Sequence, residues 1–422
     1  MPQPPAEIGG FIENSVTATA RSRLAQSDIQ AFLPSRGAFT FPAPYGTRGV
    51  RITNEGDCGG QDCVASVGYS YWRNTNNHVH DDTMLIFLGL NNQRGGTGPT
   101  LFEYNKITEE IRKVGPLFPE GTSFRNMSGE QWYFSAMLPN ALYVRDNSKL
   151  VRFDVITKTT ETVFDVTTEF GSGHYMWQPH SSNDDRVHSA TLRRSSDYAD
   201  LGCMVYFEDS RSFRFFPKQG SYDECQIDRS GRWLVIKENV SGRNSSDNRI
   251  IDLASGSERV LFDEDGAGGH SDMGYGVMVA ADNWSKPNAW RIWDFNHPTL
   301  DGSYVYFNDH WQAPAPNHVS FANAREDTPL SDQYACGSVA SSKTAVHANE
   351  VICFLLGGGS NDTLVVAPVM TDMGASGGGD SYSKMPKGNL DVTGQYYIWT
   401  TNMGGNRQDA FLVRVPAQQL RR

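Results

Sequence analysis

Short apolar runs recur along the chain, and each follows a polar turn. The run Trp233–Ile236 comes directly after the turn sequence DRSGR, and the run Tyr396–Trp399 comes directly after DVTGQ. A continuous apolar stretch of this length between turn residues predicts a buried strand. Residues 149–166 and 248–263 each hold two alternating runs joined by a turn, which predicts the outer hairpin of a four-stranded blade.

These units repeat at intervals of about fifty residues. Residues 178–192, 223–238 and 385–401 align with one another, and in each an aspartate stands four residues after one shared position. Extending this register along the chain gives seven marker positions, which are Asn77, Trp132, His180, Glu224, His270, His318 and Lys387. Seven units of four strands predict an all-β fold, a seven-bladed β-propeller of four-stranded antiparallel blades.

A propeller of this size needs about 380 residues and therefore takes up most of the chain as one domain. We expect the propeller at residues 37–417, an N-terminal extension at residues 1–36 and a short tail at residues 418–422. The only helix we expect is within residues 20–32. One end of the chain should complete the blade begun by the other, because an unpaired strand edge exposes backbone hydrogen-bonding groups.

Composition narrows the range of partners. The net charge is -11, and no basic stripe is present, which argues against nucleic-acid binding. No apolar run approaches the 18 residues of a membrane span. The six cysteines are expected to form at least two disulfides and hence to indicate a secreted or periplasmic protein. Buried free thiols in a cytosolic protein are the alternative. By nearness in sequence, the pairs are Cys58 with Cys63, Cys203 with Cys225, and Cys336 with Cys353.

The candidate chemistry lies at the marker positions. The innermost strand of each blade lines the central channel, so side chains at one register of these strands should meet at one mouth. This would bring together His180, Glu224, His270, His318 and Lys387, with Asn77 and Trp132 beside them. Such a set offers metal ligands, proton-transfer groups and a cation. The alternative is that these side chains cap the turns of the blades by hydrogen bonds.

Residues near the markers extend the candidate site. Arg186 and Arg194 belong to the most basic stretch of the chain and are candidates for holding a carboxylate, and His188 lies between them. Tyr275 follows His270 closely and is a candidate acid or base, or else a core residue. Two further substrate-binding candidates follow in the later blades, namely Trp311 and Asn323.

Several enzyme classes are disfavoured. The sequence contains no G-x-S-x-G elbow, no P-loop and no H-E-x-x-H motif. Glycoside hydrolysis needs two facing carboxylates, and Glu224 is the only strong candidate among the markers.

The repeat itself resembles a known one. The order of a polar residue, D-x-S/T-G-x and an apolar strand, as in ECQIDRSGRWLVI and KGNLDVTGQYYIWTT, resembles the Tol-type propeller repeat. Among enzymes with this repeat, the chain is most similar to the oligogalacturonate lyase family and more loosely to the propeller ulvan lyases. The resemblance implies cleavage of an acidic polysaccharide by β-elimination and one divalent metal ion, Mn or Ca, held here by Glu224, His270 and His318. It implies no organic cofactor. Lys387 stands where a lyase of the metal type would place a histidine of the last blade.

These residues define a mechanism to test. Lys387, Arg194 or the metal would neutralise the carboxylate of a bound uronate, and His180 would remove the proton at C5. Tyr275 or His188 would protonate the leaving oxygen. The expected partner is therefore an acidic oligo- or polysaccharide bound by a monomer. The alternative function is a non-catalytic propeller that binds a glycan or a protein partner at the same mouth.

Overall fold

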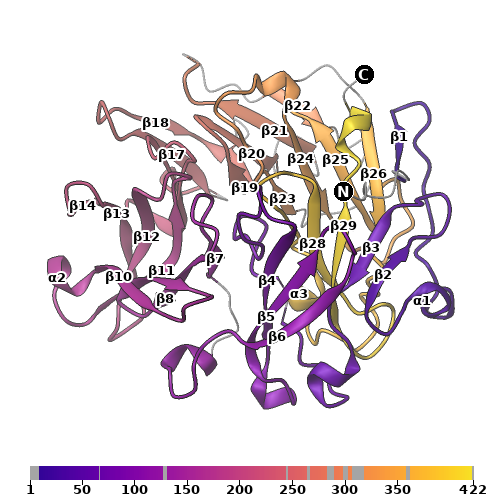
Figure 1. Cartoon of the computed structure of the whole chain (residues 1–422). Helices are drawn as coiled ribbons and strands as arrows, with labels where there is room; N and C mark the ends of the chain where they lie inside the picture. The colour runs from indigo at the N-terminus through magenta and orange to yellow at the C-terminus, as the bar shows by residue number, and fades with distance from the viewer. Residues whose placement is uncertain are drawn as a thin grey trace.

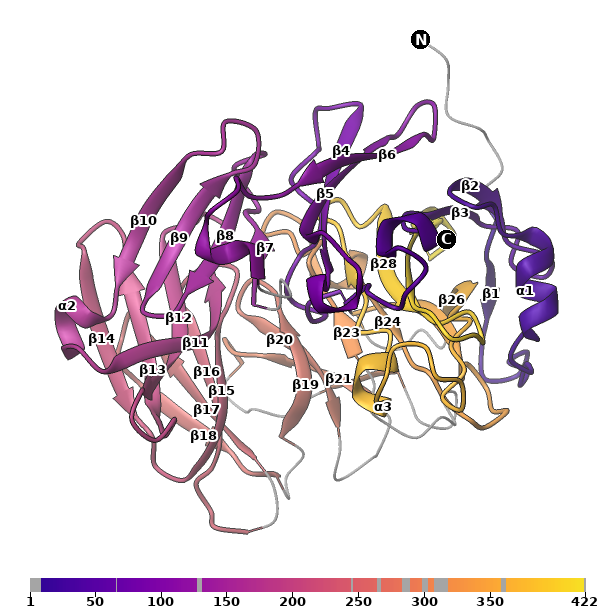
Figure 2. The same cartoon turned by 90° about the horizontal axis from the view of Figure 1, so that it is seen from below.

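The computed structural model describes residues 9–65, 67–126, 131–243, 246–263, 267–282, 289–297, 303–306, 318–357 and 362–420. Its strands form seven antiparallel sheets, arranged as blades around one axis (Figures 1 and 2). The chain passes from blade to blade around the ring, as the progression of colour in Figure 1 shows. The seven-bladed all-β propeller predicted from the repeats is confirmed.

Blades 2 to 5 are each built from four consecutive strands. Blade 2 contains β7 (Tyr133–Phe134), β8 (Ala141–Asp146), β9 (Lys149–Asp154) and β10 (Thr160–Asp165). Blade 3 contains β11 (His174–Ser181), β12 (Val187–Arg194), β13 (Asp200–Phe207) and β14 (Ser212–Pro217). Blade 4 contains β15 (Ser221–Ile227), β16 (Trp233–Asn239), β17 (Asp247–Asp252) and β18 (Glu258–Leu261). Blade 5 contains β19 (Gly268–Met273), β20 (Val277–Asp282), β21 (Ala289–Asp294) and β22 (Ser303–Tyr306).

The other three blades depart from this scheme. Blade 1 contains β4 (Thr83–Leu90), β5 (Gly98–Asn105) and β6 (Ile111–Pro116), and a single bridge from Thr75 to Ile86 marks its innermost position. Blade 6 contains β23 (His318–Ser320), β24 (Tyr334–Ser338), β25 (Glu350–Leu355) and β26 (Thr363–Pro368), with β1 (Phe11–Glu13) added at the outer edge. Blade 7 contains β27 (Asn389–Leu390), β28 (Tyr396–Thr401) and β29 (Asp409–Arg414), followed by β3 (Arg48–Arg51) and β2 (Gly37–Thr40).

Helices are short. The first, α1 (Gln26–Phe32), lies within the range expected for a helix, and α2 (Thr167–Phe170) and α3 (Ser381–Lys384) are single turns. The described ranges also contain five 3₁₀ segments, at Glu55–Cys58, Asn92–Arg94, Ser123–Asn126, Leu330–Asp332 and Ala417–Leu420. None of the helices in the described ranges has the length and apolar composition of a membrane span.

The repeated aspartate has a structural role at the turn after the innermost strand, as Asp228 of blade 4 shows. Asp228 accepts hydrogen bonds from the backbone amides of Arg232 (3.0 Å) and Trp233 (2.9 Å) through one carboxylate oxygen. Its other oxygen accepts the amide of Gly276 in the next blade at 2.8 Å. Gly231 in this turn has a φ of 74°, a conformation that favours glycine and explains the D-x-S/T-G pattern. The aspartate therefore fixes the turn and joins two blades.

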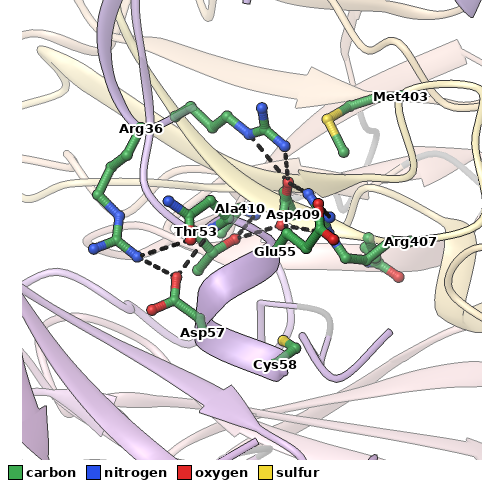
Figure 3. Close-up of polar contacts among 12 residues, drawn as sticks. Arg36, Thr53, Glu55, Asp57, Cys58, Met403, Arg407, Asp409 and Ala410 are labelled. Atoms are coloured by element: carbon green, nitrogen blue, oxygen red, sulfur yellow. Dashed lines mark hydrogen bonds and ion pairs between the residues drawn. The ribbon is translucent and has the colours of Figure 1, made fainter. Parts of the chain in front are cut away.

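Both ends of the chain meet in blade 7, where β3 pairs with β29. The buried carboxylate of Asp409 accepts hydrogen bonds from Arg51 (2.6 Å), Arg407 (2.7 Å) and the hydroxyl of Thr53 (3.0 Å). Thr53 in turn accepts the amide of Ala410 at 2.9 Å, and Figure 3 shows this network around Asp409. The expected closure of one blade by both ends is confirmed. Residues 1–36, expected as an extension, also supply β1 to blade 6 beside the orange and yellow strands of Figure 1.

Apolar side chains fill the spaces between neighbouring blades. Trp290 of blade 5, for example, stacks on Phe354 of blade 6 with ring centroids 4.7 Å apart. All six cysteines are paired as expected, in the disulfides Cys58–Cys63, Cys203–Cys225 and Cys336–Cys353. The second of these joins β13 of blade 3 to β15 of blade 4.

Candidate functional site

An aromatic segment contacts the innermost strands of several blades. Tyr69, Tyr71 and Trp72 precede blade 1, and the ring of Tyr71 lies 4.7 Å from Tyr69 and 4.8 Å from Trp72. The indole nitrogen of Trp72 donates a hydrogen bond to the carbonyl of Pro179 at 3.0 Å, and the hydroxyl of Tyr71 donates to Glu224 at 2.8 Å. The segment is therefore tied to blades 3 and 4 across the channel.

A cavity of about 270 Å³ lies against this segment, at the end of the ring where the innermost strands begin. We call it the mouth cavity. Its lining combines aromatic rings with charged and polar groups from several blades. Its principal lining residues are Tyr69, Tyr71, Trp72, Gln178, Asp223, Glu224, Lys237, Asp263, His270 and Tyr382.

A buried ion pair forms one wall of the mouth cavity. Lys237 of β16 lies opposite Glu224 of β15, and its ammonium group is 2.7 Å from one carboxylate oxygen. The exposed fractions of Glu224 and Lys237 are 6% and 3%. Burial raises the pKa of Glu224, but the charge of Lys237 and the hydrogen bonds from Lys237 and Tyr71 outweigh it and lower the pKa. Glu224 is thus a carboxylate whose charge is already compensated.

Tyr69 and His270, which line the mouth cavity, belong to a cluster of rings that also includes His318 and the ammonium group of Lys387. The imidazoles of His270 and His318 stack with centroids 4.6 Å apart, and the ring of Tyr69 lies 4.7 Å from His318 and 6.0 Å from His270. The ammonium of Lys387 lies 6.0 Å from the centroid of Tyr69 and 3.1 Å from that of Tyr382. Burial, His270 and Lys387 lower the pKa of His318 well below its ordinary value, so this imidazole is neutral.

His180 lies behind the aromatic segment. It belongs to a space of about 10 Å³ lined also by Tyr71, Trp72 and Arg229, and it does not line the mouth cavity. Its ring stacks on Trp72 with a centroid distance of 5.7 Å. Burial lowers the pKa of His180 to about 3. The bulge in β11 between Trp177 and His180 turns Gln178 to the cavity instead.

Two of the predicted catalytic residues have other partners. His188 lies in β12 with both ring nitrogens at hydrogen-bond distance from side chains, 2.6 Å from Ser181 and 2.8 Å from Glu208. The hydroxyl of Tyr275 accepts a hydrogen bond from Asn183 at 3.1 Å. Tyr275 follows the end of β19, whereas His270 lies near the beginning of that strand. Neither His188 nor Tyr275 lines the mouth cavity.

The predicted substrate-binding residues that the structure describes do not line the mouth cavity either. Arg186 pairs with Asp209 and Arg194 with Asp197, both at exposed positions. Trp132 is buried against Phe118 between blades, because its large ring fills the interblade core. Asn77 donates to the carbonyl of Ala136, and Asn323 donates to the carbonyl of Tyr334. Trp311 lies outside the described residues.

Among the principal residues that line the mouth cavity, Tyr69, Tyr71, Trp72, Lys237 and Tyr382 were not predicted from the sequence, and neither were Gln178, Asp223 and Asp263. Three aromatic residues, Tyr69, Tyr71 and Trp72, stand close together outside the repeats, and this clustering was the available signal for the aromatic segment. Lys237 interrupts the apolar run of β16, which was the signal for a buried charge.

Comparisons with known proteins identify the fold. No family model matches the chain, and no curated protein matches it. A structure of oligogalacturonate lyase in complex with manganese aligns with 98% of this chain and 100% of its own, at a TM-score of 0.63 and 13% identity. An oligogalacturonate lyase from Vibrio parahaemolyticus aligns with 97% of this chain and 99% of its own, at a TM-score of 0.59 and 10% identity. The fold is that of oligogalacturonate lyase.

A TolB structure from Acinetobacter baumannii also matches, over 67% of this chain and 63% of its own, at a TM-score of 0.41 and 12% identity. At identities this low, the likeness to oligogalacturonate lyase shows the fold alone. The chemistry of this chain has to be inferred from its own residues.

The predicted metal ligands do not fit a divalent ion. The ammonium of Lys237 already occupies the side of Glu224 where a cation would bind, and Tyr71 takes the other carboxylate oxygen. His270 and His318 stack face to face at an interplanar angle of 21°, so their nitrogens do not converge on one point. Within the described ranges, no group of three His, Cys, Asp or Glu side chains is arranged to hold a metal.

Proposed function

We propose that the protein is a polysaccharide lyase that cleaves a uronate-containing glycan by β-elimination at the mouth cavity. The observation that carries this proposal is the cluster of His270 and Tyr69, which line the mouth cavity, with the ammonium of Lys387 6.0 Å from the ring of Tyr69. It supplies an imidazole, a phenol and an ammonium group within one ring cluster, which are the base, the acid and the cation that the reaction needs.

In the proposed reaction, Lys387 neutralises the carboxylate of the bound uronate and so acidifies the proton at C5. His270, which lines the cavity, takes this proton. The electron pair of the C5–H bond forms the 4,5-double bond, and the bond from C4 to the leaving oxygen breaks. Tyr69 gives its proton to that oxygen, and burial, which raises the pKa of Tyr69 well above its ordinary value, keeps the phenol protonated beforehand.

His318 is a positioning residue in this scheme. It stacks on His270 and is only 1% exposed, and both of its ring nitrogens are buried without a hydrogen-bond partner in the described part of the chain. A neutral ring at this place orients His270 without adding a charge to it.

The charges of the mouth cavity favour one orientation of an acidic sugar. Asp223, Glu224 and Asp263 lie on the wall of blade 4, where Lys237 is already paired with Glu224. Burial and the negative charge of the neighbouring Glu224 raise the pKa of Asp223. The same charge repulsion disfavours a further anion beside these carboxylates. The carboxylate of the substrate should therefore face away from the carboxylates of blade 4 and towards Lys387.

The setting of this activity follows from the same features. Three disulfides are typical of proteins that fold in an oxidising compartment, so we propose a secreted or periplasmic enzyme acting on an extracellular acidic glycan. We further propose that it acts as a monomer.

The test is the ultraviolet absorbance of unsaturated uronates during incubation with a panel of acidic polysaccharides. Wild type should produce the signal, and His270→Ala should lower the rate by about 10²- to 10⁴-fold through loss of the base. Arg194→Ala is the matched control, because its exposed pairing with Asp197 lies away from the cavity and should leave the rate unchanged. Binding of a glycan without any absorbance change would instead support the non-catalytic module.

A further inference from the structure

A second cavity, of about 300 Å³, adjoins the mouth cavity. Tyr382 of α3 lines both, and Lys387 lines the second one. The second cavity is further lined by Arg94, at the end of the 3₁₀ segment Asn92–Arg94, and by Asp62. We call it the Arg94 cavity.

We propose that the Arg94 cavity is a second sugar subsite, in which Arg94 binds the carboxylate of the uronate adjacent to the one that reacts. This inference rests on the proposed function, because it takes the mouth cavity as the place of the reacting sugar. It goes further in requiring a glycan with acidic groups on neighbouring residues.

The charges of the two cavities support this assignment. Arg94 makes no ion pair or side-chain hydrogen bond within the described part of the chain, whereas most arginines there are paired. Both carboxylate oxygens of Asp62 accept backbone amides, from Gly378 at 2.7 Å and from Gln408 at 2.8 Å. Asp62 therefore fixes the wall of the Arg94 cavity, and the guanidinium of Arg94 is a group there that can bind an anion.

The backbone around Arg94 leaves room for a ligand. Gly378 and Gly379 have φ values of 86° and 78°. A methyl group added at Gly379 would come within 3.9 Å of both terminal nitrogens of Arg94, so the glycine keeps this face of the guanidinium open. The planar fork of an arginine suits two-point binding of a carboxylate.

Tyr382 connects the two cavities. Its side chain is 51% exposed, although one face of its ring holds the ammonium of Lys387 at 3.1 Å from the centroid. An exposed aromatic ring between two polar cavities is a suitable surface for stacking of a sugar. A glycan passing over Tyr382 would place one sugar in each cavity.

The experiment measures binding of galacturonate and glucuronate monomers, dimers and trimers to the intact protein by calorimetry. In wild type, the dimer of the preferred sugar should bind more tightly than the monomer. Arg94→Ala should weaken dimer binding about ten- to a hundredfold, the effect of losing a charged hydrogen bond, and leave monomer binding unchanged. Arg94→Lys should restore part of the loss. Arg186→Ala, which removes an exposed arginine paired with Asp209, is the control and should have no effect.

Equal loss of monomer and dimer affinity in Arg94→Ala, no loss for either, or no binding of any uronate by wild type would overturn the inference. The binding and activity measurements distinguish failure of the subsite proposal from failure of the lyase proposal. If the dimer binds through Arg94 but no unsaturated product forms, the subsite stands and the lyase proposal is wrong. If wild type cleaves acidic glycans and Arg94→Ala has the same KM for every chain length, the lyase stands and the subsite is wrong.

Discussion

Replacing Lys237 by methionine removes the cation from the buried pair with Glu224. The methionine side chain fills nearly the same space, so the main change is a buried carboxylate that has lost its partner at 2.7 Å. Breaking a buried pair in this way costs about 3–5 kcal/mol. Glu224 keeps the hydrogen bond from Tyr71 at 2.8 Å and a longer one from Gln226 at 3.3 Å. We therefore expect a loss near the lower limit, about 3 kcal/mol at neutral pH.

The pH dependence identifies the cause of this loss. In wild type the pKa of Glu224 is lowered, so the pair stabilises the fold above the unfolded-state pKa of about 4.3 and is lost as the pH falls through the lower folded pKa. In Lys237→Met, burial acts without the compensating ammonium and raises the pKa of Glu224. The penalty is then absent at low pH, where the carboxyl is protonated, and increases as the pH rises. The difference from wild type should be largest at neutral pH and shrink towards pH 4.

Urea unfolding at several pH values measures this difference. For a chain of 422 residues the unfolding entropy is about 0.9 kcal/mol/K, so 3 kcal/mol also corresponds to a decrease in Tm of about 3 °C. Lys237→Met combined with Glu224→Gln should recover part of the stability, because no buried charge remains. Lys113→Met, which breaks a more exposed pair with Asp57, is the control and should cost less than about 1 kcal/mol. A loss under 1 kcal/mol in Lys237→Met, or a loss independent of pH, would refute the reasoning.

Three further predictions concern stability and the proposed reaction. Replacing both Cys203 and Cys225 by serine removes the disulfide between blades 3 and 4, which closes a loop with a sequence separation of 22. This double substitution should lower the unfolding free energy by about 3 kcal/mol. An unchanged urea midpoint would contradict this prediction. Asp409→Ala leaves the guanidinium groups that it binds without their acceptor and should cost about 3–5 kcal/mol, which differential scanning calorimetry would detect as a lower Tm. Tyr69→Phe should keep the ring packing, and hence the Tm, but reduce the lyase rate by about 10²-fold or more; an unchanged rate would show that Tyr69 is not the acid.

The fold was predictable because its repeated element has a physical function. The aspartate of D-x-S/T-G binds backbone amides of its own turn, as Asp228 and Asp391 do, so the same residue recurs wherever this turn recurs. Glu224, His270 and Lys387 reached the cavities for the same reason, since each lies in or just before the innermost strand of its blade.

The rest of the site could not be predicted, because it depends on features that the spacing of the repeats does not encode. Because of the bulge in β11, Gln178 and not His180 lines the mouth cavity. A bulge has no regular signature in the sequence. Tyr69 and Trp72 come from a segment outside the repeats, so no register could place them. Lys237 is on the second strand of its blade and reaches the cavity only because it lies opposite Glu224 in the sheet.

The closure of blade 7 has a consequence for synthesis of the chain. Arg51 and its partner Asp409 are 358 positions apart, so β2 and β3 leave the ribosome long before β29 exists. At translation rates of about 5–20 residues per second, the early strands wait about 20–70 s for their partner. During this interval the edge of β3 has unpaired backbone groups that other chains can bind. Nascent chains stalled before residue 409 should therefore depend on a chaperone or aggregate, whereas release of the complete chain should end that dependence.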